Sequence, residues 1–126
     1  MWRQMLKSKI HRATVTGANI EYEGSITIDR DLLEAANMMM DEKVLVVNLT
    51  NGSRIESYAI PAERGSGTIC LNGGAAKHGK VGDLLIIMSF GVLDEVEIKT
   101  HVPKLVKVDA KTRIITEDAK LRKAAR

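Results

Sequence analysis

Of all the residues in this sequence, the pair Gly24-Ser25 could carry out the most distinctive chemistry. A hydroxyl that directly follows a glycine carbonyl can attack that carbonyl and exchange the amide for an ester, which cuts the backbone from within. Because Gly24 has no Cβ, we expect its peptide to take a strained geometry and its carbonyl to be open to attack. The same dipeptide is typical of an ordinary turn, so by itself it leaves both interpretations open.

A second group of reactive side chains falls on residues 53–60, which we predict to form a strand. Alternation along a strand places Arg54, Glu56 and Tyr58 on one face and Ser57 on the other. A guanidinium suits the binding of a carboxylate, and a phenol can donate a proton to a basic carbon. A core or interface tyrosine with a satisfied hydroxyl is the alternative for Tyr58.

A third group lies near the start of the chain, where residues 6–15 suit a strand. Alternation predicts that Lys7, Lys9, His11 and Ala13 share one face, so two cations and an imidazole converge. A solvated edge strand, whose lysines discourage pairing with other chains, explains the same pattern.

These side chains require β-strands and tight turns to position them. Asn51-Gly52 stands between two apolar runs, 44–50 and 53–60, and predicts a hairpin with a type I′ turn, in which both central residues have positive φ. We expect Pro61 to end the second strand.

One short helix is predicted between the cleavage pair and the hairpin. A brief strand, 26–28, is followed by residues that favour helix, with Asp29 or Asp31 as the N-cap and Asn37 in the left-handed closing position. Before the cleavage pair, 16–19 is predicted to be a turn that leads into a strand over 20–22.

The second half of the chain is rich in short strands. Residues 72–76 form a loop of small residues where a ligand could approach the backbone, or a simple turn. The apolar run 84–88 is typical of a central strand buried on both faces, whereas 93–100 is ambiguous. Further strands are predicted over 68–71, 104–108 and 113–115. Many short strands, one clear helix and regular turns favour a compact, mainly β barrel.

Composition indicates one intracellular domain that spans residues 1–126. The single cysteine, Cys70, excludes an internal disulfide and lies in an apolar run, which is typical of a small buried hydrophobe. The N-terminus lacks the regions of a secretory signal, and no apolar run approaches the ~18 residues of a membrane span, so we expect a cytoplasmic protein without membrane contact.

Charge gives little reason to expect a nucleic-acid partner. The net charge is +3, and much of the excess lies in residues 111–126. Because no aromatic residue is interleaved there for base stacking, a flexible, solubilising basic tail is favoured over contact with nucleic acid. No pair of histidines has the spacing of metal ligands with a carboxylate, so no metal is expected.

Several of these features occur together in one protein family. Over roughly residues 1–105 the chain resembles the bacterial aspartate 1-decarboxylases, self-processing pyruvoyl enzymes that make β-alanine for pantothenate and coenzyme A. The motifs that carry the resemblance are Lys9-Ile10-His11-Arg12, Tyr22-Glu23-Gly24-Ser25, Thr50-Asn51-Gly52 with Arg54 and Tyr58, Ala62-Glu63-Arg64-Gly65-Ser66, Asn72-Gly73 and Val81-Gly82-Asp83.

The resemblance implies a six-stranded double-psi β-barrel with one or two short helices, assembled as a homotetramer with active sites at subunit contacts. It also implies cleavage between Gly24 and Ser25, which leaves chains 1–24 and 25–126 and converts Ser25 into a pyruvoyl group. The keto group of this cofactor would react with the amine of L-aspartate, without pyridoxal phosphate or metal.

By the same resemblance, Arg54 and Lys9 bind substrate carboxylates and Tyr58 returns a proton after decarboxylation. Ser57, where threonine is usual, and His11 would assist processing. The residues implied to line the substrate pocket are Ser57, Asn72, Gly73, Gly74, which stands where alanine is usual, and Ala75.

Two other functions remain open from the residues. The chain could be a basic β-barrel binding module in which Gly24-Ser25 is only a turn. Such a protein would stay intact and would bind its ligand with a salt-dependent affinity. An enzyme of the same fold could also decarboxylate another small acidic amino acid.

Overall fold

The computed structural model of the chain describes residues 1–117. Within these residues, nine strands form one sheet in the order β2-β6-β3-β5-β4-β7-β1-β8-β9. The elements are β1 (Arg3–Thr14), β2 (Gly17–Asn19), β3 (Ser25–Asp29), α1 (Arg30–Ala35), β4 (Lys43–Asn48), β5 (Arg54–Ala62), β6 (Ile69–Asn72), the 3₁₀ helix η1 (Gly73–His78), β7 (Leu84–Leu93), α2 (Glu95–Ile98), β8 (Lys104–Val108) and β9 (Ile114–Glu117).

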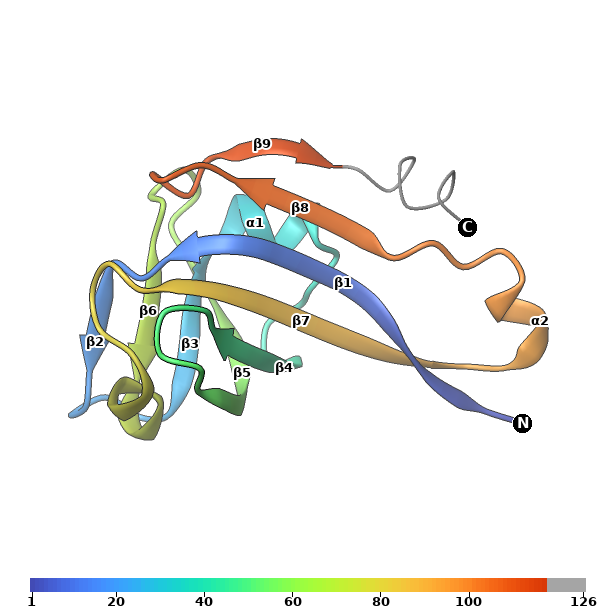
Figure 1. Cartoon of the computed structure of the whole chain (residues 1–126), viewed down its shortest axis with the longest axis horizontal. Coiled ribbons are helices and arrows are strands. Elements are labelled where there is room, and N and C mark those ends of the chain that lie inside the picture. Colours follow the sequence, from blue (N-terminus) through green and yellow to red (C-terminus); the bar gives the residue numbers. More distant parts are fainter. Residues whose placement is uncertain (118–126) are drawn as a thin grey trace.

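The sheet curls, so that β2, β6 and β3 run steeply across the direction of β1, β7 and β8 (Figure 1). β1 and β7 continue beyond the body as a two-stranded arm that leads to α2 (Figure 1). The predicted mainly β architecture with few short helices is confirmed. The expected number of six barrel strands is not confirmed, because nine strands share the sheet in the described part of the chain.

The core is built from aliphatic side chains on the inner face of the curled sheet. Ile10 of β1, Ile26 of β3 and Ile87 of β7 are fully buried. Along β7 only alternate residues are buried, and Ile86 and Met88 remain half-buried. The prediction that this central strand is buried on both faces is therefore wrong for the single chain, although β7 does lie between β4 and β1.

Two bulges interrupt β1 and change which side chains share a face. The pairing of β1 with β7 shifts at Lys7 and again at Arg12, which has a φ of 70°. The second shift turns Ala13 into the core, where it is fully buried, whereas His11 is only half-buried. The predicted common face of Lys9, His11 and Ala13 is thus wrong at Ala13, because a bulge adds a residue to the alternation.

The predicted hairpin is present as β4 and β5, but its turn differs. Gly52 has a φ of 82°, whereas Asn51 does not have a positive φ. The Gly52 N–H donates to the Asn48 carbonyl at 2.8 Å, and the Asn48 N–H donates to the Ser53 carbonyl at 2.8 Å. The connection is therefore a longer loop with glycine at its single left-handed position, and not a type I′ turn.

Strand β5 continues through Pro61 to Ala62, so the proline does not end it. β5 pairs with β4 only as far as Tyr58 and then pairs with β3. Pro61 consequently lies where one side of β5 has no neighbouring strand, and there the missing N–H costs no ladder bond.

The start and end residues predicted for the short helix are confirmed in α1. The Asp29 carboxylate caps it by accepting from the Asp31 N–H at 2.8 Å, and Asn37 follows its end with a φ of 53°. The same carboxylate accepts from the N–H groups of Gly65 and Gly67 at 3.1 and 2.9 Å. One buried side chain thus joins the end of β3 to the loop before β6.

Arg64 also connects the loop before β6 to α1. Its guanidinium lies 2.6 Å from Asp31 Oδ1 and 2.7 Å from Glu34 Oε1. Hydrogen bonding from Arg64 holds the pKa of the Glu34 carboxyl below its usual range. The Ala62–Ser66 motif therefore has a structural role, which is to hold the C-terminal end of β3.

The remaining segments agree with the predictions only in part. Residues 17–19 form β2, where a turn was predicted, and 20–22 form a turn where a strand was predicted. The ambiguous stretch contains α2, which begins with a capping box between Asp94 and Glu97. The strand predicted over 113–115 is confirmed as β9, which pairs with β8 inside the segment 111–126 that was also predicted to be a flexible tail, and residues 118–126 lie outside the described part. No helix within residues 1–117 has the length and apolar character needed to cross a membrane.

Candidate active site

The hydroxyl of Ser25 lies at the start of β3, in register with β6. Ser25 pairs with Asn72 across the two antiparallel strands, and its side chain is 1% exposed. Asn72 Nδ2 donates to Ser25 Oγ at 2.8 Å. Ser25 has a φ of 157°, at the border of a backbone region that residues with a Cβ rarely adopt. The predicted nucleophile is therefore buried, hydrogen-bonded and held in an uncommon backbone conformation.

Gly73, the first residue of η1, packs directly against the backbone of the cleavage pair. It has a φ of 59°, and a Cβ at this position would lie 2.8 Å from both the Gly24 nitrogen and the Tyr22 carbonyl oxygen. At Gly24, by contrast, an added Cβ would meet no atom within 4 Å, and its φ is not positive. The steric requirement for glycine that we predicted at Gly24 therefore belongs to Gly73.

An open cavity of about 400 Å³ lies beside the cleavage pair. The predicted residues that line it are Gly24, Ser25, Ser57, Tyr58, Gly74 and Ala75. A small amino acid fits a cavity of this size. The structure therefore brings the predicted nucleophile, the predicted proton donor and most of the predicted pocket wall together in one chain.

His78, at the end of η1, also lines this cavity, although no predicted role was attached to it. Its backbone carbonyl accepts from Asn48 Nδ2 at 3.1 Å and from Asn51 Nδ2 at 3.0 Å. Asn48 also donates to Asp83 Oδ2 at 2.9 Å, and this bond lowers the pKa of the Asp83 carboxyl. The hairpin loop and the Val81–Asp83 turn thus fix the end of the helix that forms the cavity wall.

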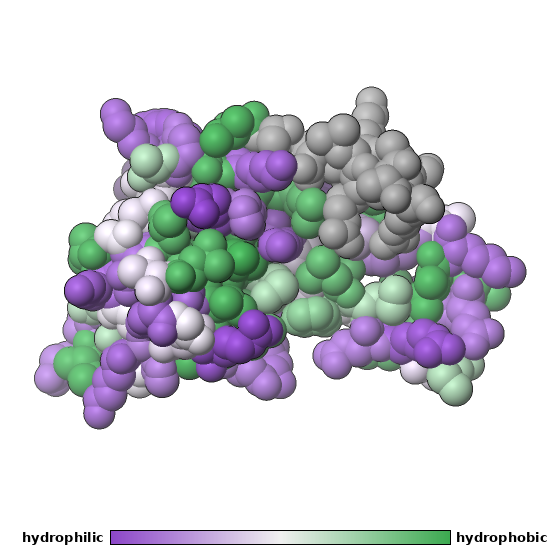
Figure 2. Space-filling view, in the orientation of Figure 1, coloured by the Kyte–Doolittle hydropathy of each residue, from purple (hydrophilic) through white to green (hydrophobic). Residues whose placement is uncertain are grey.

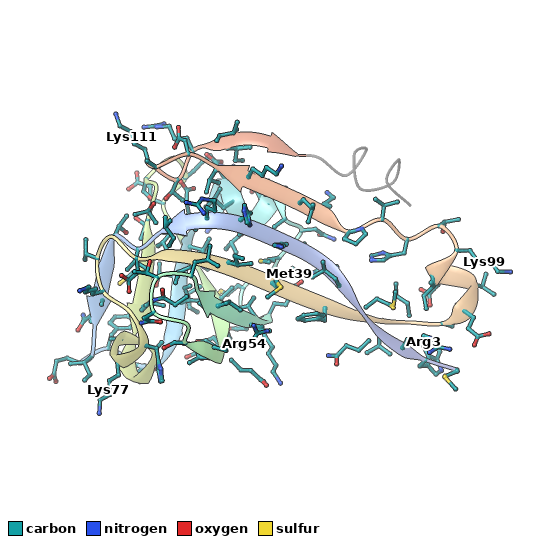
Figure 3. All side chains as sticks on the ribbon, viewed as in Figure 1. Arg3, Met39, Arg54, Lys77, Lys99 and Lys111 are labelled. Carbon is teal, nitrogen blue, oxygen red and sulfur yellow. The ribbon has the colours of Figure 1, made fainter. Side chains whose placement is uncertain are left out.

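The predicted cations do not line the cavity. Lys9 and His11 lie on β1, which is separated from β3 by β5, β4 and β7 in the sheet. Arg54 is exposed at the start of β5 and lies on the same side of the body as Lys77 (Figure 3). Arg54, Glu56 and Tyr58 are all exposed, as the predicted alternation requires, and Glu56 forms an ion pair with Lys43 of β4.

Comparison with known proteins identifies the family. The sequence model of the family described as aspartate decarboxylase matches residues 1–115. The chain belongs to the aspartate decarboxylase family. It is 59% identical over 114 residues to the aspartate 1-decarboxylase of Listeria monocytogenes, with 90% of each chain covered. It is also 59% identical over 115 residues to the aspartate 1-decarboxylase of Acetivibrio thermocellus, with 91% of each chain covered.

Within this aspartate decarboxylase fold, two further polar residues lie beside the predicted nucleophile. Asn72 Nδ2 donates to Thr27 Oγ1 at 2.8 Å, and Cys70 Sγ donates to Asn72 Oδ1 at 3.3 Å. We predicted only a strand for 26–28 and a small hydrophobic role for Cys70. Their contacts depend on the register between β3 and β6, which local sequence patterns do not specify.

A polar cluster connects the two chains, 1–24 and 25–126, that cleavage would produce. Lys7 Nζ lies 2.7 Å from Glu42 Oε2 and donates to the Asn37 carbonyl at 2.5 Å. Burial by itself raises the pKa of the Glu42 carboxyl, but hydrogen bonds from Lys7, Ser89 and Met39 outweigh it, so the pKa is lowered. Among the described residues, no group of three or more His, Cys, Asp or Glu could hold a metal ion. Catalysis without a metal stays a prediction.

Proposed function

We propose that this chain is an aspartate 1-decarboxylase that forms its own pyruvoyl group by cleavage between Gly24 and Ser25. The observation that carries the proposal is the position of Ser25: it is buried, its hydroxyl accepts from Asn72, and the residue lines a cavity together with Tyr58, in a chain of the aspartate decarboxylase family. The product β-alanine would enter the synthesis of pantothenate and coenzyme A.

The first covalent step uses only atoms of the chain. Ser25 Oγ attacks the Gly24 carbonyl carbon, the C–N bond breaks, and the hydroxyl proton moves to the Ser25 nitrogen, which leaves an ester. Loss of the Ser25 Cα proton then expels the Gly24 carboxylate, and water hydrolyses the remaining enamine with release of ammonia. The serine ends as a pyruvoyl group without any change in net oxidation state.

The residues around Ser25 fit such a group. The keto carbon would form at a buried position that faces a cavity of about 400 Å³, with Asn72 Nδ2 as a hydrogen-bond donor beside it. A pyruvoyl group supplies a carbonyl that takes up the amine of the substrate and withdraws the electrons of the breaking carbon–carbon bond. Ser57 lines the same cavity and is our candidate for stabilising the oxyanion during cleavage.

Tyr58 is the proposed proton donor. Its side chain is 38% exposed and lines the cavity beside Ser25. A phenol is a proton donor that can protonate the carbon that has lost carbon dioxide. Gly74 and Ala75, both in η1, also line the cavity, and an added Cβ at Gly74 would meet no atom within 4 Å.

Binding of the two carboxylates of aspartate requires cations that one chain does not bring to the cavity. Lys9 and His11 lie on β1, which three other strands separate from β3 in the sheet, whereas Arg54 is close in sequence to the lining residues. We propose that a second copy in a homotetramer supplies Lys9 and His11. Exposed hydrophobic side chains such as Met39 and Phe90 support assembly, and hydrophobic side chains gather across the middle of one face (Figure 2).

Mixed assemblies test this arrangement. Lys9→Ala chains lack the cation, and Ser25→Ala chains lack the electrophile, so each homo-oligomer has little activity. If the site is shared, chains that are mixed, dissociated and reassembled recover part of the wild-type turnover. No recovery in assemblies shown to contain both chains would place Lys9 and Ser25 of each site in the same chain.

Release of carbon dioxide from L-aspartate tests the proposed function itself. Purified protein is expected to form equal amounts of β-alanine and carbon dioxide, and the Ser25→Ala variant is expected to stay intact and form neither. Faster turnover of L-glutamate than of L-aspartate would reassign the substrate to another small acidic amino acid. An intact wild-type chain with no turnover of either would contradict the proposal.

A further inference from the structure

Four side chains on one face of the β3–β6 ladder surround the predicted cleavage site. The antiparallel register pairs Ser25 with Asn72 and Thr27 with Cys70. Because alternate residues of a strand point the same way, the four side chains share one face of the sheet. Gly17 of β2 closes the far side, since a Cβ there would lie 3.2 Å from Cys70 Sγ. Only Ser25 and Asn72 have a role in the predicted site.

The carboxamide of Asn72 is held from three sides by the other members of this group. Its Nδ2 donates to Ser25 Oγ and to Thr27 Oγ1, both at 2.8 Å, which uses both of its N–H groups. Its Oδ1 accepts from Cys70 Sγ at 3.3 Å. Burial raises the pKa of the Cys70 thiol, so the thiol stays protonated and can donate at neutral pH. Asn72 itself is only 3% exposed, so water contributes little to its hydrogen bonding.

This arrangement decides what the Ser25 hydroxyl can do. An amide N–H can only donate, so Ser25 Oγ accepts from Asn72 and its own proton stays available for transfer. If the carboxamide rotated, its oxygen would instead accept the Ser25 proton and hold it away from the nitrogen that must receive it. The direction of the Asn72 amide is therefore coupled to the reactivity of Ser25.

We propose that Thr27 and Cys70 are positioning residues for self-cleavage: they hold the Asn72 carboxamide so that its N–H group faces Ser25 Oγ. The inference rests on the proposed cleavage between Gly24 and Ser25. It adds two residues that act through Asn72 and do not touch the substrate. Thr27 has the larger effect of the two, because a hydroxyl at 2.8 Å is a stronger partner than a thiol at 3.3 Å.

Cleavage kinetics of newly made chains test the proposal. Full-length protein is made by cell-free synthesis, samples are quenched in denaturant over time, and the cut fraction is measured on a denaturing gel. We expect Thr27→Val, which removes the hydroxyl at nearly constant volume, to slow cleavage about tenfold, and Cys70→Ala about threefold. Thr27→Ser and Cys70→Ser keep a donor and acceptor and are expected to cleave within twofold of the wild-type rate.

The controls separate positioning from a general loss of structure. Thr68→Val removes a comparable hydroxyl just before β6, outside the Asn72 contacts, and is expected to leave the rate unchanged. Thermal unfolding of each chain in a non-cleavable Ser25→Ala background reports folding separately. If Thr27→Val lowers Tm as well, Thr27→Ser decides: recovery of the rate supports positioning, and failure to recover contradicts it.

Wild-type rates for both Thr27→Val and Cys70→Ala would overturn the inference while leaving the proposed function intact. A wild-type chain that never cuts after Gly24 would instead refute the proposed function, together with any role of Thr27 and Cys70 in it. The two failures are distinguishable, since the first appears only in the variants and the second in the unmodified chain.

Discussion

The cleavage corner, formed by Gly24, Ser25, Thr27, Asn72 and Gly73, differs sharply from the predicted cationic residues Lys9, His11 and Arg54. The corner is closed within one chain: adjacent strands bring its side chains to hydrogen-bond distance, and Gly73 packs against the Gly24 backbone. The cationic residues lie on β1 and at the exposed start of β5, outside the cavity. Under the proposed function, the chemistry that makes the electrophile would therefore be local, whereas the binding of a charged substrate would draw on a second copy of the chain.

The largest expected effect lies in the cleavage corner. Gly73→Ala must place a Cβ 2.8 Å from two backbone atoms and hold alanine at a φ of 59°, so we expect cleavage to slow about a thousandfold. Gly74→Ala is the matched control, because its Cβ meets no atom within 4 Å, and it is expected to cleave normally. The cut fraction on a denaturing gel gives both results. Equal rates for the two variants would show that close packing on Gly24 is not needed.

Tyr58→Phe separates cleavage from turnover at one cavity. The phenol lines the cavity but has no part in the acyl shift, so the variant is expected to cut fully and to lose about a hundredfold in kcat. Rates of carbon dioxide release from the fully cut protein measure the effect. Wild-type kcat would transfer the proton-donor role to another group, such as His78.

Arg54→Ala probes the cationic residues. Loss of a guanidinium that binds a carboxylate is expected to lower kcat/KM about thirtyfold, mainly through KM, with cleavage unchanged. Arg30→Ala, an exposed arginine at the start of α1, is the control and is expected to leave KM unchanged. Slower cleavage of the Arg54→Ala chain would contradict the separation of roles between the cleavage corner and the cationic residues, because a predicted substrate-binding residue would then act in processing.

The smallest expected effect concerns the contact between chains 1–24 and 25–126. Lys7→Met removes the ion pair with Glu42, which is expected to lower Tm by about 3 °C at pH 7. Because the pKa of Glu42 is lowered in the folded state, the pair stabilises above the ordinary carboxyl pKa and is lost as pH falls through the lowered value. The difference in Tm between variant and wild type is therefore expected to shrink in acid to the part contributed by the hydrogen bond from Lys7 to the Asn37 carbonyl. A constant difference across pH would exclude the Glu42 charge as its cause.

Features of the fold that depend on local chemistry were predictable from the sequence. The Asp29 cap and Asn37 closure of α1 were identified, and the hairpin was placed around Asn51-Gly52. Features set by pairing between distant segments were not predictable. Strand β2 exists because Gly17–Asn19 adds to β6, and Ala13 is buried because of a bulge against β7. Neither effect leaves a pattern within a short window of sequence.

The residues of the candidate site also fall into two groups, those that could be predicted from the sequence and those that could not. Ser25 and Tyr58 were found from residue types and family motifs, and they do line one cavity. Thr27 and Cys70 were missed, because their contacts with Asn72 follow from the register of β3 against β6. His78 was missed because 72–76 was predicted to be a loop or a simple turn, whereas the 3₁₀ helix η1 extends to His78 and brings it to the wall of the cavity.

Intact-mass analysis of freshly purified and aged protein tests the central claim most directly. If Ser25 is converted in place, the sample contains one fragment that ends at Gly24 and a larger one whose mass is lower by one ammonia than a chain beginning with serine. The larger fragment is also blocked against N-terminal sequencing. A single intact chain after ageing, or a larger fragment that retains an N-terminal serine, would contradict the account.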